Sequence, residues 1–176
     1  MISIIKATVE DFQSIVDIGN ISVAEAHMDS CSPAELNEYL KRNYTPDAVK
    51  DELRNPDNIY HLINYKETPV GFSKIILNAA HPNIGAGNVT KLDRIYLLKE
   101  FFGLKLGLKL LNFNISLAKN NHQSGIWLYT WVGNKRAVNF YLKAGFIITG
   151  SHHFYVTDES YNLNHQMFLN FCLTES

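Results

Sequence analysis

The chain has 176 residues, 46% of them hydrophobic, and a formal net charge of −1. This length and apolar content predict a single domain, residues 1–176, with one full hydrophobic core. The near-neutral charge excludes the broad positive surface that non-specific nucleic-acid binding requires, so no nucleic-acid partner is expected.

The first third of the chain has the pattern of one strand followed by helices. Residues 2–6 have the composition of a short strand. Thr8, with Asp11 three residues later, is typical of a helix N-cap ahead of an apolar run. Ser32-Pro33 and Thr45-Pro46 each indicate the start of a further short helix, because proline suits the first helical position.

The middle of the chain is rich in residues that favour strands. The runs 59–65 and 70–77 are joined by the turn-like residues 66–69, which predicts a hairpin. Residues 79–88 contain one proline and two glycines and are expected to form a loop before another strand, 89–98.

The segment 104–118 fits two periodicities. Its leucines alternate with polar residues as in a strand, yet its polar positions recur every three or four residues, as in one stripe of a helix. These positions are Lys105, Lys109, Asn112, Ser116 and Lys119. We interpret the segment as a helix, because a strand of this length without a turn is unusual.

The last third alternates strands with one helix. Strands are expected at 125–131, 146–156 and 163–170, with a helix at 134–144. The whole order, β-α-α-α-β-β-β-α-β-α-β-β, predicts an α/β (α+β) fold with helices on both faces of a mixed sheet. The hairpin supplies antiparallel pairing, and the β-α-β passage from 89 to 131 supplies parallel pairing.

The sequence has no feature of a membrane, secreted or metal-binding protein. No stretch approaches ~18 uninterrupted apolar residues, and no basic segment followed by a long apolar core opens the chain. We therefore expect a cytoplasmic protein with no membrane partner. Cys31 and Cys172 lie far apart and form no CxxC pair, so both are expected to be free thiols and no metal site is expected.

The first candidate site is the turn between the strand 89–98 and the helix that follows. Such a turn presents unpaired backbone N–H groups at the positive end of a helix dipole, a geometry that binds phosphates. Gly103 and Gly107 would let the backbone approach a pyrophosphate closely. The same pattern is also typical of an ordinary strand-to-helix turn, so by itself it leaves both interpretations open.

The second candidate site is the helix around Tyr141. Asn134 is a good N-cap, and Gly145 is suited to end the helix in the left-handed conformation. One face of the helix carries Ala137, Phe140, Tyr141 and Ala144. Tyr141 either fills the core with its hydroxyl bonded to backbone or presents a phenol to a site.

Together the two segments resemble the GNAT superfamily of N-acetyltransferases. Its members carry a strand Leu-x-x-Ile-Tyr-Leu, then Gln/Arg-x-x-Gly-x-Gly/Ala, and later Asn-x-x-Ala-x-x-Phe-Tyr-x-x-x-Gly-Phe. Here these are Leu92–Leu97, Phe102–Gly107 and Asn134–Phe146. The last motif matches at every fixed position, whereas Phe102 replaces Gln or Arg and Lys105 replaces a glycine. The resemblance covers most of the chain and is closest to the PaiA-like branch of small-amine and polyamine acetyltransferases.

The resemblance implies a GNAT fold, a mixed but mostly antiparallel sheet of about seven strands with helices on both faces and one splayed strand pair. It also implies acetyl-CoA as cosubstrate, direct transfer to a primary amine, and no metal. Tyr141 would be the general acid that protonates the CoA thiolate. Ile95, Tyr96 and Leu97 would pair with the pantetheine arm, Asn134 would contact it, and the pyrophosphate would lie against Phe102, Gly103, Leu104, Lys105, Leu106, Gly107 and Leu108.

The acceptor side is marked less clearly. An attacking amine must lose a proton, which requires a base or a water chain. Asp93 could point toward the substrate or be an exposed strand carboxylate, and Glu25 and Asp29 could attract a cationic amine or be solvated. The sequence gives no role to His27, His152 and His153.

We therefore expect a small, polyamine-like primary amine as the acceptor, and a monomer or homodimer. Two alternatives stay open. One is acetylation of protein or peptide N-termini, which the carboxylates near residues 25–29 make less favourable than a small cation. The other is a non-catalytic acyl-CoA-binding regulatory protein on the same fold, which the altered positions Phe102 and Lys105 favour.

Overall fold

The computed structural model describes residues 1–173 of the chain. The strands and helices, in chain order, are β1 (Ile2–Lys6), α1 (Phe12–His27), α2 (Pro33–Asn43), α3 (Pro46–Arg54), β2 (Ile59–Tyr65), β3 (Thr68–Ile76), β4 (Val89–Leu97), α4 (Leu106–Asn120), β5 (Gly125–Trp131), α5 (Lys135–Lys143), β6 (Ile147–Tyr155) and β7 (Tyr161–Asn170). The predicted order is confirmed. The single domain expected over 1–176 stays a prediction, and residues 174–176 lie outside those described.

Side-chain caps begin α2 and α3 where the sequence predicts them. The cap predicted at Thr8 begins a short 3-10 turn, Val9–Asp11, and α1 follows it without a side-chain cap of its own. The Ser32 hydroxyl accepts a hydrogen bond from the Glu35 amide at 3.3 Å, and the Glu35 carboxylate accepts one from the Ser32 amide at 2.8 Å. The Thr45 hydroxyl caps α3 by accepting a hydrogen bond from the Ala48 amide at 3.3 Å, without a return bond. Each cap satisfies amides that the helix itself leaves unpaired, which explains why these helices begin at their prolines.

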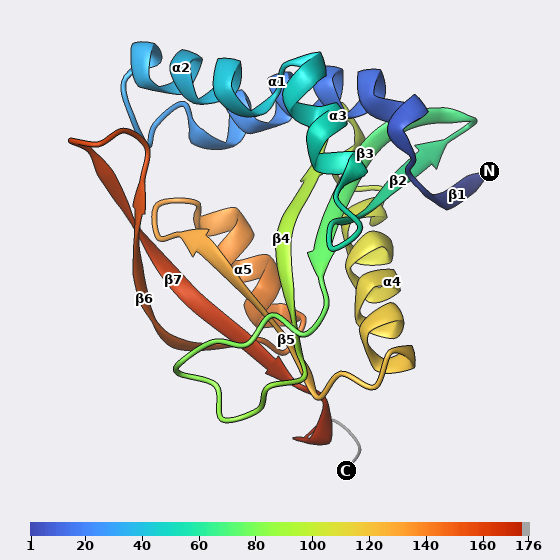
Figure 1. Cartoon of the computed structure of the whole chain (residues 1–176), viewed down its shortest axis with the longest axis vertical. Helices are drawn as coiled ribbons and strands as arrows, with labels where there is room; N and C mark the ends of the chain where they lie inside the picture. The colour runs from blue at the N-terminus through green and yellow to red at the C-terminus, as the bar shows by residue number, and fades with distance from the viewer. Residues whose placement is uncertain (174–176) are drawn as a thin grey trace.

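The seven strands form one sheet in the order β1-β2-β3-β4-β5-β7-β6. Every neighbouring pair is antiparallel except β4 and β5, which confirms the mixed, mostly antiparallel sheet. β4 and β5 pair only over Val89–Lys91 and Gly125–Trp127. Beyond these residues they diverge, as Figure 1 shows, and this is the splayed pair that the family resemblance implies.

The turn of the β2–β3 hairpin is tighter than predicted. Tyr65 pairs with Thr68, so only Lys66 and Glu67 lie between the strands, and both have positive φ. A two-residue hairpin loop with two left-handed residues matches the right-handed twist of the strands. Thr68 and Pro69, expected in the turn, therefore belong to β3.

Helix α4 begins at Leu106, two residues later than predicted. Gly103 and Lys105 have φ of 86° and 59°, so the backbone is left-handed on both sides of Leu104 and cannot yet be helical. The predicted polar stripe is confirmed. Its five residues, Lys105, Lys109, Asn112, Ser116 and Lys119, are all exposed.

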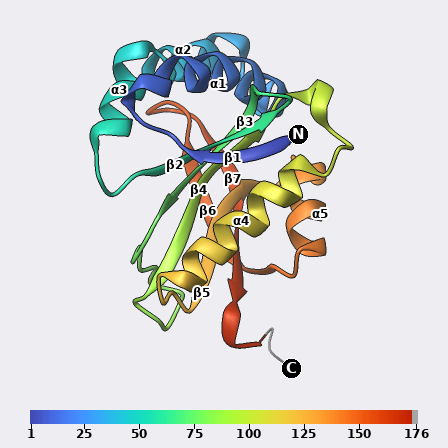
Figure 2. The same cartoon turned by 90° about the vertical axis from the view of Figure 1, so that its right-hand side faces the viewer.

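The helices cover both faces of the sheet (Figure 2). α1, α2 and α3 share a hydrophobic cluster with β2 and β3 on one face. α4 and α5 pack against β4, β5 and β7 on the other face. β4 therefore lies between two cores and contributes side chains to each.

Tyr44 joins α1 to the interior of the sheet. Its ring packs against Gly19 of α1, where a β-carbon would overlap it, and lies 6.4 Å from the Phe72 ring of β3. Tyr44 is 2% exposed, and the Arg94 guanidinium lies 5.2 Å from its ring centre. The absence of a side chain at Gly19 thus sets how closely α1 approaches β4.

Replacing Gly19 by alanine should lower the free energy of unfolding by about 1–3 kcal/mol, because Tyr44 has no free space to move into. Urea denaturation measures the change. The control is Gly87→Ala, where nothing lies within 4 Å of the new β-carbon, and its effect should stay below about 1 kcal/mol. Equal stability of the two variants would mean that the Tyr44 ring can shift freely.

Candidate active site

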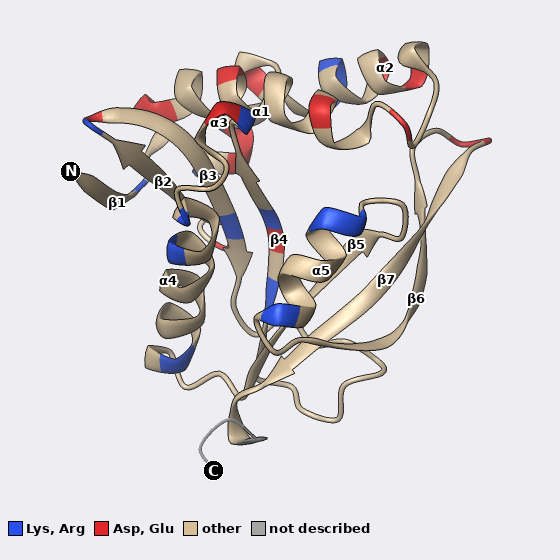
Figure 3. Cartoon of the chain, turned by 180° about the vertical axis from the view of Figure 1, so that it is seen from behind, with Lys and Arg blue, Asp and Glu red and all other residues tan. Residues whose placement is uncertain are grey.

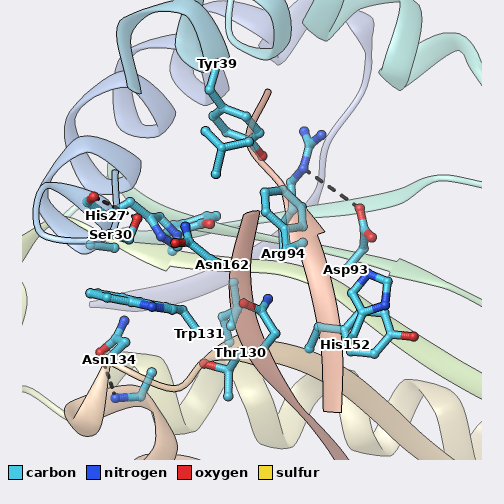
Figure 4. Close-up of a pocket in the computed structure, with 18 of the residues that line it drawn as sticks. His27, Ser30, Tyr39, Asp93, Arg94, Thr130, Trp131, Asn134, His152 and Asn162 are labelled. Atoms are coloured by element: carbon cyan, nitrogen blue, oxygen red, sulfur yellow. Dashed lines mark hydrogen bonds and ion pairs between the residues drawn. The ribbon is translucent and has the colours of Figure 1, made fainter. Parts of the chain in front are cut away.

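A cavity of about 420 Å³ opens where β4 and β5 separate. Its walls come from the end of α1, from α2, from the start of α5, and from β4, β5, β6 and β7. In the view of Figure 4, Trp131 and Asn134 lie toward one end of the cavity, and Asp93 and His152 toward the other. The cavity therefore joins the face covered by α5 to the face covered by α1 and α2.

Four of the residues predicted to form the site line this cavity. They are Ile95, Tyr96, Asn134 and Tyr141. Leu97 and the turn Phe102–Leu108 do not belong to the lining, although Leu97 continues the same strand edge. The structure thus brings the β4 edge, the α5 cap and the phenol together, and leaves the predicted phosphate turn beside them.

Asn134 begins α5 as predicted. Its carboxamide oxygen accepts a hydrogen bond from the Ala137 amide at 3.1 Å. That bond fixes the side chain at the helix N-terminus and leaves its amide nitrogen as the group available to a ligand.

Tyr141 has its ring in the core and its hydroxyl at the cavity. The side chain is 7% exposed, and its ring lies 5.2 Å and 5.6 Å from the rings of Phe140 and Phe146. No residue within 1–173 offers its hydroxyl a hydrogen-bond partner. Burial raises the pKa of Tyr141, and the nearby Arg136 only partly opposes this. The phenol therefore stays protonated at neutral pH.

The turn before α4 has the geometry of an anion site. The first amide to donate within the helix is that of Lys109, to the Lys105 carbonyl at 3.0 Å. The amides of Leu106, Gly107 and Leu108 precede it and have no intrahelical acceptor. They lie at the positive end of the α4 dipole, where an anion is stabilised.

The turn and α5 touch each other. The Arg136 guanidinium of α5 lies 3.7 Å from the centre of the Phe102 ring, a cation–π contact. A β-carbon at Gly107 would lie 3.9 Å from the Phe140 ring, so the first turn of α4 packs closely on α5. Phe102 thereby holds a cation beside the turn, at the position where the family motif has Gln or Arg.

A β-bulge in β4 builds a charged cluster on the other face. Lys74 pairs with Arg94, but Ile75 pairs with Leu92, so Asp93 is an extra residue in β4. The bulge lets Asp93 and Arg94, although adjacent in sequence, take part in one ion-pair network. Figure 3 shows these charges as neighbouring red and blue bands on β4.

Two carboxylates and three cations make up this cluster. The Lys74 ammonium lies 2.6 Å from Glu52 and 3.1 Å from Asp93, and the Lys91 ammonium lies 2.7 Å from Asp93. Arg94 lies 3.8 Å from both carboxylates and donates to the Tyr60 hydroxyl at 2.9 Å. Burial alone would raise the pKa of Asp93, but Lys91 and Lys74 outweigh it and hold that pKa below its ordinary value.

The acceptor-side residues considered from the sequence fall into two groups. Asp93, His27 and His152 line the cavity, so Asp93 is not an exposed strand carboxylate. Burial lowers the pKa of His27, and burial followed by the charge of Lys91 lowers that of His152. Glu25 and Asp29 are exposed and lie outside the lining, and His153 stacks on Tyr161 instead.

The cationic members of the cluster, and the aromatic wall that Tyr129 and Trp131 form, were not predicted from the sequence. One signal was available. Lys91, Asp93 and Arg94 place three charges within four positions of an otherwise apolar strand. Charges at this density in a central strand indicate mutual pairing or a site, because an unpaired buried charge is costly.

Within residues 1–173, no group of three histidine, cysteine, aspartate or glutamate side chains could hold a metal ion. Cys31 and Cys172 are both free, and Cys31 lines the cavity. Over the same residues, no helix is both long and apolar enough to cross a membrane.

Sequence comparison relates the chain to acetyltransferases. The sequence model of the Acetyltransferase (GNAT) family matches residues 21–146. An uncharacterized N-acetyltransferase in the pepI 3' region of Lactobacillus delbrueckii subsp. lactis is 23% identical over 158 residues, which cover 90% of this chain and 91% of that protein.

Solved structures share the fold. The PaiA N-acetyltransferase of Thermoplasma acidophilum, crystallised with coenzyme A, has a TM-score of 0.77 at 21% identity, over 97% of this chain and 99% of that one. The ribosomal-protein-S18-alanine N-acetyltransferase of Escherichia coli has a TM-score of 0.70 at 13% identity, over 97% and 94%. At these identities the likeness establishes the arrangement of strands and helices.

Replacing Lys74 by methionine should lower the free energy of unfolding at pH 7 by about 1–3 kcal/mol, because it removes the buried ammonium that contacts the half-buried carboxylates of both Glu52 and Asp93. Urea denaturation across pH measures this. Both carboxyl pKa values lie below their ordinary values in the native chain and should rise in the variant. The difference in the free energy of unfolding between the native chain and the variant should therefore become smaller below about pH 4, where the carboxyls become protonated.

Arg54→Met is the matched control for this cluster. Arg54 pairs with Asp51 at 3.2 Å, but both side chains are more than half exposed. Removing an exposed pair should cost less than about 1 kcal/mol. A Lys74→Met protein as stable as the control would show that the two carboxylates do not depend on Lys74.

Proposed function

The chain belongs to the GNAT acetyltransferase family, and we propose that it moves the acetyl group of acetyl-CoA to the primary amine of a small molecule by direct transfer within a single domain. N-acetyl transfer from acetyl-CoA is the activity of that family. The observation that carries the proposal for this chain is the cavity at the β4–β5 splay, which the β4 edge, the α5 cap and the Tyr141 phenol all line.

We propose that the pantetheine arm pairs with the free edge of β4. Beyond Lys91 this edge has lost β5 as a partner, so the backbone groups of Ile95, Tyr96 and Leu97 can bond an extended ligand as a further strand would. The amide of Ile95 or Leu97 would then polarise the acetyl carbonyl. Asn134 at the start of α5 would contact the pantetheine through its amide nitrogen.

The pyrophosphate is proposed to bind the turn Phe102–Leu108. Unpaired amides at the α4 N-terminus support this, as does the left-handed backbone at Gly103 and Lys105 that turns the chain around them. Arg136, held over the Phe102 ring, would supply a positive charge at the family's Gln or Arg position. The departures of the sequence from the motif are thus compatible with phosphate binding.

In the proposed reaction the amine nitrogen attacks the thioester carbon, the C–N bond forms, and the C–S bond breaks. Tyr141 gives its proton to the departing thiolate, for which a protonated phenol in a buried position is suited. Asp93 is not the base, because lysines hold both of its oxygens. The proton that the amine loses would pass to His27 or His152, which line the cavity and whose lowered pKa values favour the neutral imidazole.

The sequence predicted a polyamine-like acceptor, and this stays a prediction. Glu25 and Asp29, the carboxylates that favoured it, lie on the surface outside the cavity. The cavity volume suits a small molecule beside the end of the pantetheine arm. A protein N-terminus and a non-catalytic binding role are the alternatives that the experiments below distinguish.

Acetyl-CoA should stabilise the protein. At about 100 times its dissociation constant it adds about 2.7 kcal/mol to the free energy of unfolding. This corresponds to a rise in Tm of about 5–10 °C for a chain of this size. Differential scanning fluorimetry measures the shift, and adenosine, which lacks the pyrophosphate and the pantetheine, should produce little. No shift and no calorimetric heat at millimolar acetyl-CoA would exclude the proposal.

Tyr141→Phe should lower kcat about 100-fold and leave the KM for acetyl-CoA within about twofold, because only the proton donor is removed. A thiol-release assay with amines, amino acids and peptide N-termini as acceptors measures this. Tyr155→Phe, on the exposed β6 and outside the cavity lining, is the matched control and should leave kcat unchanged.

Two other outcomes of that assay are decisive. An unchanged kcat in Tyr141→Phe would remove Tyr141 from its role as general acid. Binding of acetyl-CoA without CoA release from any acceptor would favour the regulatory alternative instead.

A further inference from the structure

The charged cluster gives the α1–α2 side of the cavity an excess of positive charge. Lys74, Lys91 and Arg94 face two carboxylates, Glu52 and Asp93, so one positive charge remains uncompensated. Lys91, Asp93 and Arg94 line the cavity directly. The side chains of Lys74 and Arg94 are 6% and 11% exposed, so solvent screens their charges little.

The cavity has no free carboxylate for a second ammonium group. Among the described lining residues Asp93 is the one carboxylate, and lysines lie within 3.1 Å of both its oxygens. The two histidines of the lining, His27 and His152, cannot take the place of a carboxylate, because an imidazole is either neutral or positively charged. A diamine or polyamine would therefore bring its remaining ammonium to a wall that repels it, without a partner to offset its desolvation.

The hydroxyl of Tyr129, on the same wall of the cavity, has a proton available for a hydrogen bond to a ligand. His81 is held neutral because burial, His152 and Lys91 all lower its pKa. Its Nδ1 accepts the Asn83 amide at 3.2 Å, so its single proton sits on Nε2, which lies 2.6 Å from the Tyr129 hydroxyl oxygen. Tyr129 thus already accepts a hydrogen bond, and its own proton is free to donate.

Tyr129 and Lys91 lie together on the cavity wall. The Lys91 ammonium is 5.9 Å from the centre of the Tyr129 ring. The His152 ring stacks on the same tyrosine, with 4.1 Å between the two ring centres. Both Tyr129 and Lys91 belong to the lining. A hydroxyl donor beside an ammonium, backed by a cluster of net positive charge, forms a receptor for an anion.

We propose that the acceptor is an amine that also carries an anionic group, a carboxylate or a phosphate, which binds against Lys91 and Tyr129. The proposal rests on the proposed acetyl transfer and names the acceptor class for that site. The positive wall also disfavours the ammonium form of the bound amine, which lowers its pKa and supplies the neutral nucleophile that attack requires. The pKa of a polyamine's nitrogen would also be lowered, but a polyamine has no anionic group to bind Lys91 and Tyr129.

Matched acceptor pairs test this. We compare L-lysine with 1,5-diaminopentane and L-ornithine with 1,4-diaminobutane, which differ by the carboxylate, and O-phosphoethanolamine with ethanolamine, which differ by the phosphate. The anionic member of at least one pair should have the higher kcat/KM for CoA release, by roughly tenfold or more. The pair that responds identifies the anion.

Calorimetry on the CoA-saturated protein, with the same six compounds, keeps the test independent of turnover. Tighter binding of an anionic member supports the proposal. Equal binding within every pair, no binding by any compound, or tighter binding of the diamines overturns it. Failure of the acetyltransferase proposal is seen separately, as absent binding of acetyl-CoA.

Lys91→Met removes the cation from the wall and makes the cluster neutral. The KM for the preferred anionic acceptor should rise roughly tenfold, whereas the KM for its partner without the anion should not rise and the KM for acetyl-CoA should change less than about twofold. Lys91→Arg should retain the preference for the anion. Lys143→Met, an exposed lysine of α5 outside the cavity, is the control and should leave all three values unchanged. Equal loss for both members of the pair would contradict a role for Lys91 in anion binding.

Discussion

β4 and β5 share hydrogen bonds over only three residues each, and the arrangement of the rest of the molecule depends on that early separation. A sheet normally gains stability from every paired residue, so the unpaired part of β4 must be held in place from elsewhere. β3 pairs with its other edge, and hydrophobic clusters lie on both of its faces. The open edge is therefore rigid although it has lost its partner, which is the condition for binding an extended ligand without first ordering the strand.

The bulge at Asp93 decides which side chains reach each end of the cavity. Without an extra residue, Asp93 and Arg94 would point to opposite faces, and the ion-pair cluster could not form. With it, the α1–α2 end of the cavity is charged and polar, and the α5 end holds Asn134 and the buried phenol of Tyr141. The bulge in β4 thus gives the cavity a charged end for the amine and an end with a phenol for the thioester, as the proposed acetyl transfer would require.

Much of the fold was predictable because its signals are local. The caps at Ser32 and Thr45, the prolines that follow them and the polar stripe of α4 act within one or two helical turns, so their physics is contained in short stretches of sequence. The β2–β3 turn and the start of α4 were displaced by two residues because left-handed conformations at Lys66, Glu67 and Lys105 depend on strand twist and packing as well as on residue type.

By itself the sequence determined the order of strands and helices, the motif segments at Phe102–Gly107 and Asn134–Phe146, and the burial of Tyr141. Only the tertiary structure decided which charges meet. Glu52 comes from α3, Lys74 from β3, and Lys91 with Arg94 from β4. The register that joins them depends on one unpaired residue, and no pattern in the chain encodes it, because a bulge is fixed by the pairing of two strands and not by either strand alone.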